Sequence, residues 1–355
     1  MRILVVRTDR IGDVVLSTPV LSFLREQVPD CHLTMLVSPY SAKVVEGHPD
    51  LDELLIDTQE EWYKGLRGFL YLIRDLRSKC FDMVFILHAT ARLALACRIA
   101  GIPERVGSAY RWYGFLFNKK VYEHRRNSVK HEIEYNLGVV RTCFSDSSSP
   151  SPTIQIPIKA IQKVKILLNQ WQKNPEKDLV LLHPGSGGSA RNWPVQSYRE
   201  LAGRLSDSGI QVIVTGSYEE KNIVDQVMPS RVNTISAVAG DVDVKELAAL
   251  IQIATVCVTN STGPLHIAAT VGTPTVALFC PIKPCSPVRW GPYGNNHEVL
   301  MPDVPPCPRC IEDACQYFDC MKRISVQNVF EAIQRQLVAR HLKTSKVSGG
   351  TLFCD

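Results

Sequence analysis

Two segments of the chain begin in the same way, and this repeat limits the folds that the sequence can adopt. An apolar strand at residues 2–7 leads into a Gly-containing turn at 8–13, and a second strand at 178–183 leads into a second such turn at 184–189. A strand, a glycine turn and a helix start, in this order, open a Rossmann-like α/β domain. Two openings predict two such domains, with parallel sheets facing across a cleft where ligands bind beyond the carboxyl ends of the strands.

The length of the chain agrees with this repeat, because 355 residues suit two ordinary domains. The Ser- and Pro-rich residues 145–152 have the composition of a linker. We therefore predict an N-terminal domain, a C-terminal domain, a last helix and a flexible tail, over residues 1–155, 156–325, 326–343 and 344–355. Strands that alternate with helices call for right-handed crossovers and a parallel sheet in each domain.

The composition excludes several classes of protein. The chain is 45% hydrophobic and 21% charged, and no apolar run approaches the ~18 residues that a membrane span needs. Charged residues follow the first short apolar run at once, which argues against a signal peptide and predicts a cytoplasmic protein. The net charge of +5, without basic clusters interleaved with aromatic residues, gives no case for nucleic acid. It fits anionic substrates or an anionic membrane surface.

Four of the twelve cysteines, Cys307, Cys310, Cys315 and Cys320, lie close together in the sequence. Their spacing is compatible with a structural zinc site that has no open coordination position. It equally fits a loop of buried or redox-variable thiols, and we favour this second interpretation because no flanking sequence fixes a ligand geometry. Neither interpretation makes these cysteines catalytic.

The second half of the chain has three strand-to-helix loops that suit a diphosphate, because free N–H groups and the helix dipole favour negative charge there. The first loop, residues 186–189, is followed by Arg191 and Trp193. Arg191 can donate two parallel hydrogen bonds to phosphate oxygens, and Trp193 can form one side of the site. The second, residues 215–220, ends in a carboxylate suited to ribose hydroxyls by analogy with dinucleotide sites. The third, residues 260–266, has a Gly-Pro turn into a helix.

Each of these features also has a simpler interpretation. The glycine turn is often only a tight turn, and Glu220 fits a solvated residue in the first turn of a helix. His266 equally suits a core histidine, and Asp13 a polar loop residue or helix cap. The motif Asp241-Val-Asp243 is similar to a metal motif, but Asp243 precedes a predicted helix and is more simply its N-cap. We expect no metal and no cofactor.

Taken together, the motifs resemble those of glycosyltransferase family 9, the lipopolysaccharide heptosyltransferases and their relatives. The resemblance covers nearly the whole chain in order. It is carried by Gly12-Asp13 with Thr18-Pro19, Phe81-Asp82, His131-Glu132 with Asn136, residues 183–185 with 191–194, residues 215–216 with Glu220, and residues 260–266 with Pro274. It implies a GT-B architecture, an ADP-activated heptose in the second domain, a lipid-linked acceptor in the first, and inversion at the anomeric carbon.

The resemblance also assigns roles to single residues. Asp13 matches the family's catalytic aspartate and suits the base that takes the acceptor proton. Arg191, where a lysine is usual in the family, is expected to hold the phosphate, and such fixed donors make a metal unnecessary. The other expected donor-binding residues are Ser186, Gly187, Trp193, Glu220, Ser261, Thr262, Gly263 and His266. The expected acceptor-binding residues are Arg10, Gly12 and Thr18.

One residue departs from the family pattern. Ser261 stands where characterised heptosyltransferases carry an aspartate, so a different nucleotide sugar and another cell-surface glycan stay open. A non-catalytic nucleotide-sugar-binding protein also stays open. An epimerase acting on UDP-N-acetylglucosamine would need several acid/base groups around the sugar, and a NAD-dependent dehydrogenase a Gly-x-Gly-x-x-Gly turn; neither is evident.

A run of basic residues in the first domain bears on the membrane. Lys119, Lys120, Arg125, Arg126 and Lys130 are placed to meet acidic headgroups or acceptor phosphates, although such a run is usually a solvated face. We expect peripheral contact with the inner face of the membrane.

Overall fold

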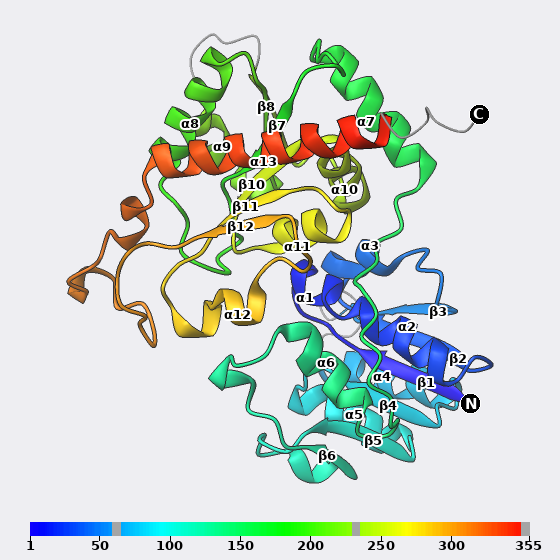
Figure 1. Ribbon diagram of the computed structural model, residues 1–355. Coiled ribbons are helices and arrows are strands. Elements are labelled where there is room, and N and C mark those ends of the chain that lie inside the picture. Colours follow the sequence, from blue (N-terminus) through cyan, green and yellow to red (C-terminus); the bar gives the residue numbers. More distant parts are fainter. Residues whose placement is uncertain (59–64, 229–234, 349–355) are drawn as a thin grey trace. The chain divides into compact units, whose positions relative to one another are not determined.

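The computed structural model describes residues 1–58, 65–228 and 235–348, and it divides the chain into two compact units, Met1–Gln155 and Ile156–Asp355. Each unit contains a six-stranded parallel sheet, with orders β3-β2-β1-β4-β5-β6 and β9-β8-β7-β10-β11-β12 (Figure 1). Numbered within its own unit, each sheet has the order 3-2-1-4-5-6, which is that of the doubly wound Rossmann fold. The predicted class, two Rossmann-like domains of GT-B type, is confirmed.

The first unit contains short parallel strands separated by helices. The strands are β1 (Arg2–Val6), β2 (His32–Val37), β3 (Glu53–Ile56), β4 (Met83–Ile86), β5 (Glu104–Ser108) and β6 (Lys119–Val121). The helices are α1 (Ile11–Val15), α2 (Thr18–Gln27), α3 (Ala42–Val45), α4 (Gly65–Ser78), α5 (Ala91–Ala100) and α6 (Glu132–Val140), with 3₁₀ turns η1 (Pro39–Ser41), η2 (Gly114–Leu116) and η3 (Arg125–Asn127). The central strands β1 and β4 are continuous apolar runs because helices cover both faces of a parallel sheet.

The second unit repeats this plan and ends in a long helix. Its strands are β7 (Leu179–His183), β8 (Gln211–Gly216), β9 (Ile235–Ala239), β10 (Val256–Asn260), β11 (Thr275–Leu278) and β12 (His297–Leu300). Its helices are α7 (Ile158–Gln170), α8 (Val195–Asp207), α9 (Lys221–Val227), α10 (Val244–Ile253), α11 (Gly263–Thr270), α12 (Pro287–Trp290) and α13 (Val326–Ser348), with 3₁₀ turns η4 (Tyr218–Glu220), η5 (Lys283–Cys285), η6 (Glu312–Ala314) and η7 (Cys320–Arg323).

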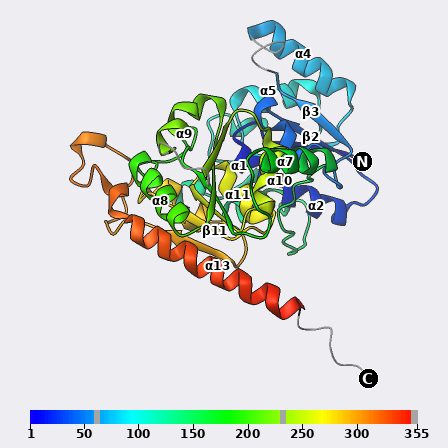
Figure 2. The same ribbon diagram turned by 90° about the horizontal axis from the view of Figure 1, so that it is seen from above.

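The structure tests two details of the predicted second unit. Asp243 is the N-cap of α10, because its carboxylate accepts from the backbone N–H groups of Lys245 and Glu246 at 2.8 and 3.0 Å, and this prediction is confirmed. The predicted start of the tail is wrong, since α13 continues through Ser348 and packs on α8 (Figure 2). The rest of the predicted tail lies outside the described residues. No described helix is long and apolar enough to cross a membrane.

Candidate active site

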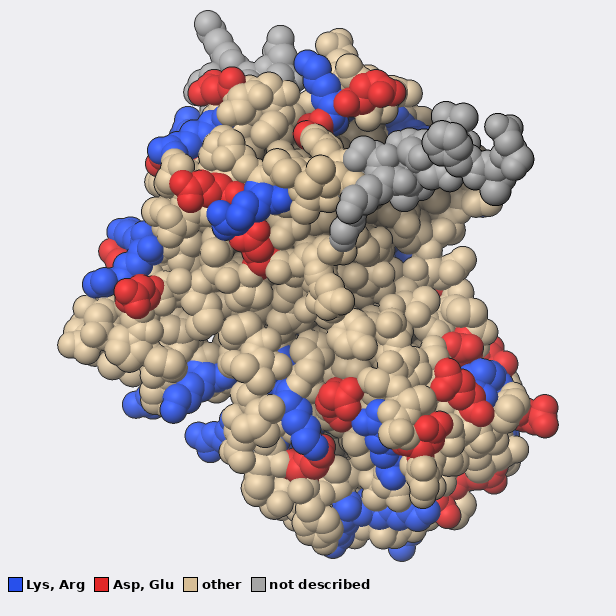
Figure 3. Space-filling view, viewed as in Figure 1, with Lys and Arg blue, Asp and Glu red and all other residues tan. Residues whose placement is uncertain are grey.

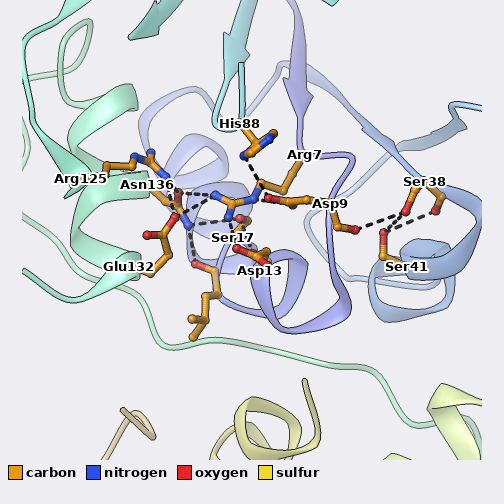
Figure 4. Close-up of polar contacts among 11 residues, drawn as sticks. Arg7, Asp9, Asp13, Ser17, Ser38, Ser41, His88, Arg125, Glu132 and Asn136 are labelled. Carbon is orange, nitrogen blue, oxygen red and sulfur yellow. Dashed lines mark hydrogen bonds and ion pairs between the residues drawn. The ribbon is translucent and has the colours of Figure 1, made fainter. Parts of the chain in front are cut away.

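A buried arginine organises the carboxyl end of β1 in the first unit. Arg7 directly follows this strand and is 1% exposed. Its guanidinium donates to Asp9 Oδ1 at 2.8 Å and to the carboxylate of Asp13. It also donates to Glu132 Oε1 and Asn136 Oδ1, each at 3.0 Å (Figure 4). Three carboxylates therefore surround one buried cation, which compensates the cost of removing these charges from water.

Helix α6 holds the C-terminal end of α1, the short helix that carries Asp13. Glu132 and Asn136 are four residues apart, so they lie on one face of α6, and both are fully buried. Arg125 of η3 donates to the same Glu132 and Asn136 oxygens as Arg7, at 2.5 and 3.1 Å. The Asn136 side-chain amide donates to the Leu16 carbonyl at 3.0 Å and to the Ser17 hydroxyl at 3.2 Å, and that hydroxyl in turn donates to the backbone carbonyl of Asp13 at 2.7 Å. The Asp13 backbone is thus linked to α6 through Ser17 and Asn136.

Asp13 is mostly buried and surrounded by charged side chains. Burial raises its pKa to about 6, and the charges of Asp9 and Glu132 add to this effect, whereas Arg7 opposes it. The side chain is still 17% exposed. His88, just beyond β4, lies with Nδ1 3.2 Å from Asp9 Oδ2, and burial lowers the pKa of His88. The carboxyl ends of β1 and β4 therefore share one polar cluster.

The other residues predicted for the acceptor have different environments. Arg10 is exposed, and Gly12 is buried in α1. Thr18 is fully buried, and its hydroxyl donates to the Val15 carbonyl at 2.8 Å and accepts from the Thr153 N–H at 2.9 Å. The prediction that Thr18 binds acceptor is wrong for this structure, because its polar groups are used inside the unit. Arg10 stays an acceptor-binding candidate.

Sequence reasoning did not single out Arg7, Asp9 or His88. A signal for Arg7 was present, since an arginine at the end of a wholly apolar central strand must be buried and therefore needs acidic partners. The sequence identified Glu132 and Asn136 only as part of a family motif, without a role for either side chain. Their partner could not be found without the fold, because they lie more than a hundred residues from Arg7 in the sequence.

In the second unit, Glu220 joins the loops that follow β7 and β8. Its carboxylate accepts from the backbone N–H of Gly187 at 2.9 Å and of Ser217 at 3.0 Å. Burial acts to raise the pKa of Glu220, but these hydrogen bonds and nearby His183 outweigh burial and lower it. A Cβ at Gly185 would lie 2.1 Å from Glu220 Oε1, so only glycine admits the carboxylate. Glu220 is 9% exposed, and its interpretation as a solvated helix residue is wrong.

Asn260, at the end of β10, joins the first and third loops. Its side chain accepts from the Trp193 backbone N–H at 2.9 Å and donates to the Pro184 carbonyl at 2.7 Å. The Ser189 hydroxyl donates to the Ser261 carbonyl at 3.0 Å and adds a second link. The predicted residues Ser186, Gly187, Ser261, Thr262 and Gly263 therefore belong to one hydrogen-bonded set of loops at neighbouring strand ends. Such loops present backbone N–H groups to an anion.

Three predicted donor-binding side chains differ in what they can do. Arg191 is partly exposed, donates to the Cys310 sulfur and lies 5.1 Å from the centroid of the Phe318 ring. Trp193 is fully buried in the core, and its indole N–H donates to the Ile324 carbonyl at 2.8 Å. The prediction that Trp193 walls the donor site is therefore wrong. His266 is 4% exposed, which matches the core interpretation better than an open ligand-binding position.

The cysteine-rich segment contacts other parts of the second unit. Among residues 1–58, 65–228 and 235–348, no group of three or more His, Cys, Asp or Glu side chains is arranged to hold a metal ion. The backbone of Cys307 instead pairs with Ile282, and Cys310 contacts Arg191.

Two Rossmann-like units, one with a buried charge cluster and one with loops suited to an anion, define a two-domain α/β protein of the nucleotide-binding class. The chain belongs to glycosyltransferase family 9 (heptosyltransferase), whose model matches residues 69–318. It is therefore a glycosyltransferase.

Named relatives and solved structures agree with the family. The chain is 29% identical over 318 residues to a Haemophilus influenzae protein named "Putative glycosyltransferase", with 85% of this chain and 89% of the relative covered. It is 26% identical over 294 residues to lipopolysaccharide heptosyltransferase 2 of Escherichia coli K12, covering 80% and 84%. The structure of E. coli ADP-heptose lipopolysaccharide heptosyltransferase II aligns with a TM-score of 0.78 at 22% identity, covering 96% of this chain and 100% of the other. At this level of identity, the structural alignment shows that the two chains share a fold.

Proposed function

We propose that this glycosyltransferase moves heptose from ADP-heptose to a lipopolysaccharide core or a related lipid-linked acceptor, with inversion at the anomeric carbon. The likeness to lipopolysaccharide heptosyltransferase 2 supports lipopolysaccharide as the acceptor class, and the likeness to the E. coli ADP-heptose lipopolysaccharide heptosyltransferase II structure supports ADP-heptose. The observation that carries the proposal is Asp13, a partly exposed carboxylate whose pKa burial raises to about 6 and which Arg7 holds in place.

The proposed reaction needs a base for the acceptor and charge stabilisation for the leaving group. Asp13 takes the proton of the acceptor hydroxyl while that oxygen bonds to the anomeric carbon. The bond from this carbon to the diphosphate breaks, and the electron pair leaves with ADP. Arg191 and the backbone N–H groups of the loops after β7 and β10 stabilise the developing negative charge, so no metal ion is required.

Turnover with matched donors tests this proposal. Purified protein is incubated with a truncated lipid-linked core acceptor and with ADP-heptose, or with UDP- or GDP-sugars, with and without EDTA. We expect product only from ADP-heptose, unchanged by EDTA, with NMR showing the anomeric configuration opposite to that of the donor. A product of retained configuration, or activity abolished by EDTA and restored by a divalent cation, would contradict the mechanism.

One observation favours a second candidate for the donor sugar. Ser261 is 8% exposed and offers a short neutral hydroxyl where an aspartate is expected for heptose. An ADP-activated sugar other than heptose therefore remains the alternative. Comparing Ser261→Asp with the wild type on several ADP-sugars distinguishes the two, because heptose transfer rises in the variant only if Ser261 has redirected the specificity.

A further inference from the structure

The segment between β5 and α6 exposes large aromatic side chains that the core does not use. Trp112 is 80% exposed, and Phe115 and Tyr122 are each 70% exposed. Single exposed hydrophobic residues are ordinary, but three rings of this size within eleven positions of one edge of a domain indicate a contact surface. β6, which this segment contains, is the edge strand of its sheet (Figure 1).

Neighbouring aromatic residues anchor this segment. Tyr113 and Phe117 are 6% and 3% exposed and belong to the core of the first unit. The Tyr113 hydroxyl donates to the Ala89 carbonyl, and Phe117 packs against Gly107, where a Cβ would lie 2.6 Å from the ring. Because inward-facing rings alternate with outward-facing ones, Trp112 and Phe115 are presented by an ordered segment.

Basic side chains accompany the exposed rings. Arg111, Lys120 and Arg126 are exposed in the same segment, and Figure 3 shows Lys and Arg gathered along the margin below the position of β6 in Figure 1. The one carboxylate between β6 and η3, Glu123, pairs with Lys130 at 2.6 Å. The segment therefore combines apolar rings with an excess of positive charge. Lys120 and Arg126 belong to the basic run predicted to meet acidic headgroups, but the exposed rings beside them could not be predicted, because the fold decides which aromatic rings point outward.

We propose that these six residues, Arg111, Trp112, Phe115, Lys120, Tyr122 and Arg126, form a membrane-docking surface for anionic lipid. Aromatic side chains suit the headgroup level of a bilayer, where an apolar ring and a polar edge are both satisfied. Lys and Arg beside them are attracted to anionic headgroups. Nucleic acid fits less well, because rings that stack on bases line a basic groove, whereas these three rings flank an edge strand.

The docking surface also adjoins the charge cluster. Arg125 of η3 follows Tyr122 by three residues and donates to Glu132, which contacts Arg7. Docking there brings a membrane-anchored acceptor close to Asp13; this consequence rests on the proposed function, whereas lipid binding itself does not.

Vesicle binding without any substrate tests the proposal. The full chain is sedimented with vesicles of phosphatidylcholine alone and of phosphatidylcholine with phosphatidylglycerol. We expect binding to the anionic vesicles that weakens with salt. Two triple variants should each weaken this binding at least tenfold. The first removes the rings, Trp112→Ser/Phe115→Ser/Tyr122→Ser. The second reverses the charges, Arg111→Glu/Lys120→Glu/Arg126→Glu. Two control variants change exposed residues elsewhere and should bind as the wild type does. They are Tyr40→Ser/Tyr218→Ser for the rings and Lys159→Glu/Lys165→Glu/Lys221→Glu for the charges.

A fluorescence measurement keeps the proposal testable if a triple variant does not fold. Lipids brominated on the acyl chain should quench part of the tryptophan emission of the wild type, and Trp112→Phe, a small change at an exposed position, should lose that part. Absence of binding to anionic vesicles, equal loss in the control variants, or quenching unchanged in Trp112→Phe would overturn the proposal. So would salt-sensitive binding to single-stranded RNA without binding to vesicles.

Discussion

The two units share one sheet topology but use opposite chemistry at the corresponding place. Where the strand order reverses in the first unit, between β1 and β4, charged side chains bind one another around Arg7. Where it reverses in the second unit, between β7 and β10, Asn260 and Glu220 bind backbone groups instead. The fold supplies the crevice at this point, and the side chains decide its chemistry.

This difference has a physical consequence for ligands. In the first unit, burial raises the pKa of Asp13 and the charges of Asp9 and Glu132 add to this effect, which favours proton transfer. In the second, a carboxylate with a lowered pKa stays ionised and is satisfied by the loops, so the rest of those loops can meet an anion. Acid-base chemistry and anion binding are therefore separated between the units, and the following predictions test this separation.

The largest expected effect is on turnover, from Asp13→Asn. An amide cannot accept the proton, so we expect kcat to fall by roughly 10²–10⁴-fold while ADP binding by calorimetry is unchanged. Asp30→Asn, an exposed aspartate of the same unit, is the control. Turnover within a factor of about three of the wild type would remove Asp13 as the base and break the comparison.

Next in size is the loss of donor affinity in Arg191→Ala. A hydrogen bond to a charged group contributes about 1.5–3 kcal/mol, so ADP affinity should weaken by roughly 10- to 100-fold. Arg199→Ala removes an exposed arginine of α8 and should bind ADP as the wild type does. Equal affinity in both variants would show that the loops alone bind the diphosphate.

The pH dependence of kcat/KM should follow the first unit. Asp13 acts as a base only when ionised, and its pKa of about 6 lies above the ordinary value. The rate should therefore be flat above about pH 7 and fall about tenfold per pH unit below about pH 6. A profile flat down to pH 5 would assign the proton transfer to another group.

A smaller effect is expected from Glu220→Gln. The amide oxygen can replace one acceptor, but the NH₂ group would face the second backbone N–H, so the two loops should loosen. We expect about tenfold weaker ADP binding and a lower Tm. The adjacent Glu219→Gln changes an exposed carboxylate and is the matched control. If the two variants behave alike, Glu220 does not organise the loops.

The smallest effect on binding is expected from Trp193→Phe. The change leaves the buried Ile324 carbonyl without its indole donor, so stability to urea should fall by about 1–3 kcal/mol. ADP affinity should stay within about twofold, because the ring lies in the core. A large loss of affinity at unchanged stability would restore Trp193 to the donor site.

The sequence predicted the main framework because the repeat of strand, glycine turn and helix is local. Short edge elements escaped it: β6 is three residues long and two of them are lysines, which does not look like a strand without its neighbour β5. Trp193 was misassigned because a tryptophan beside a loop has the same sequence signature whether it faces a ligand or the core. The partners of Arg7 depend on α6, which only the tertiary structure brings to β1.

The close approach of Gly185 to Glu220 restricts how this chain can change by single mutations. Alanine at 185 would collide with the carboxylate, whereas a prior Glu220→Ala removes the three atoms that lie nearest to the new Cβ. The two replacements therefore should be tolerated in one order and not in the other. A library that varies both positions should recover alanine at 185 almost only together with a shortened residue at 220, which makes this pair a measurable case of epistasis.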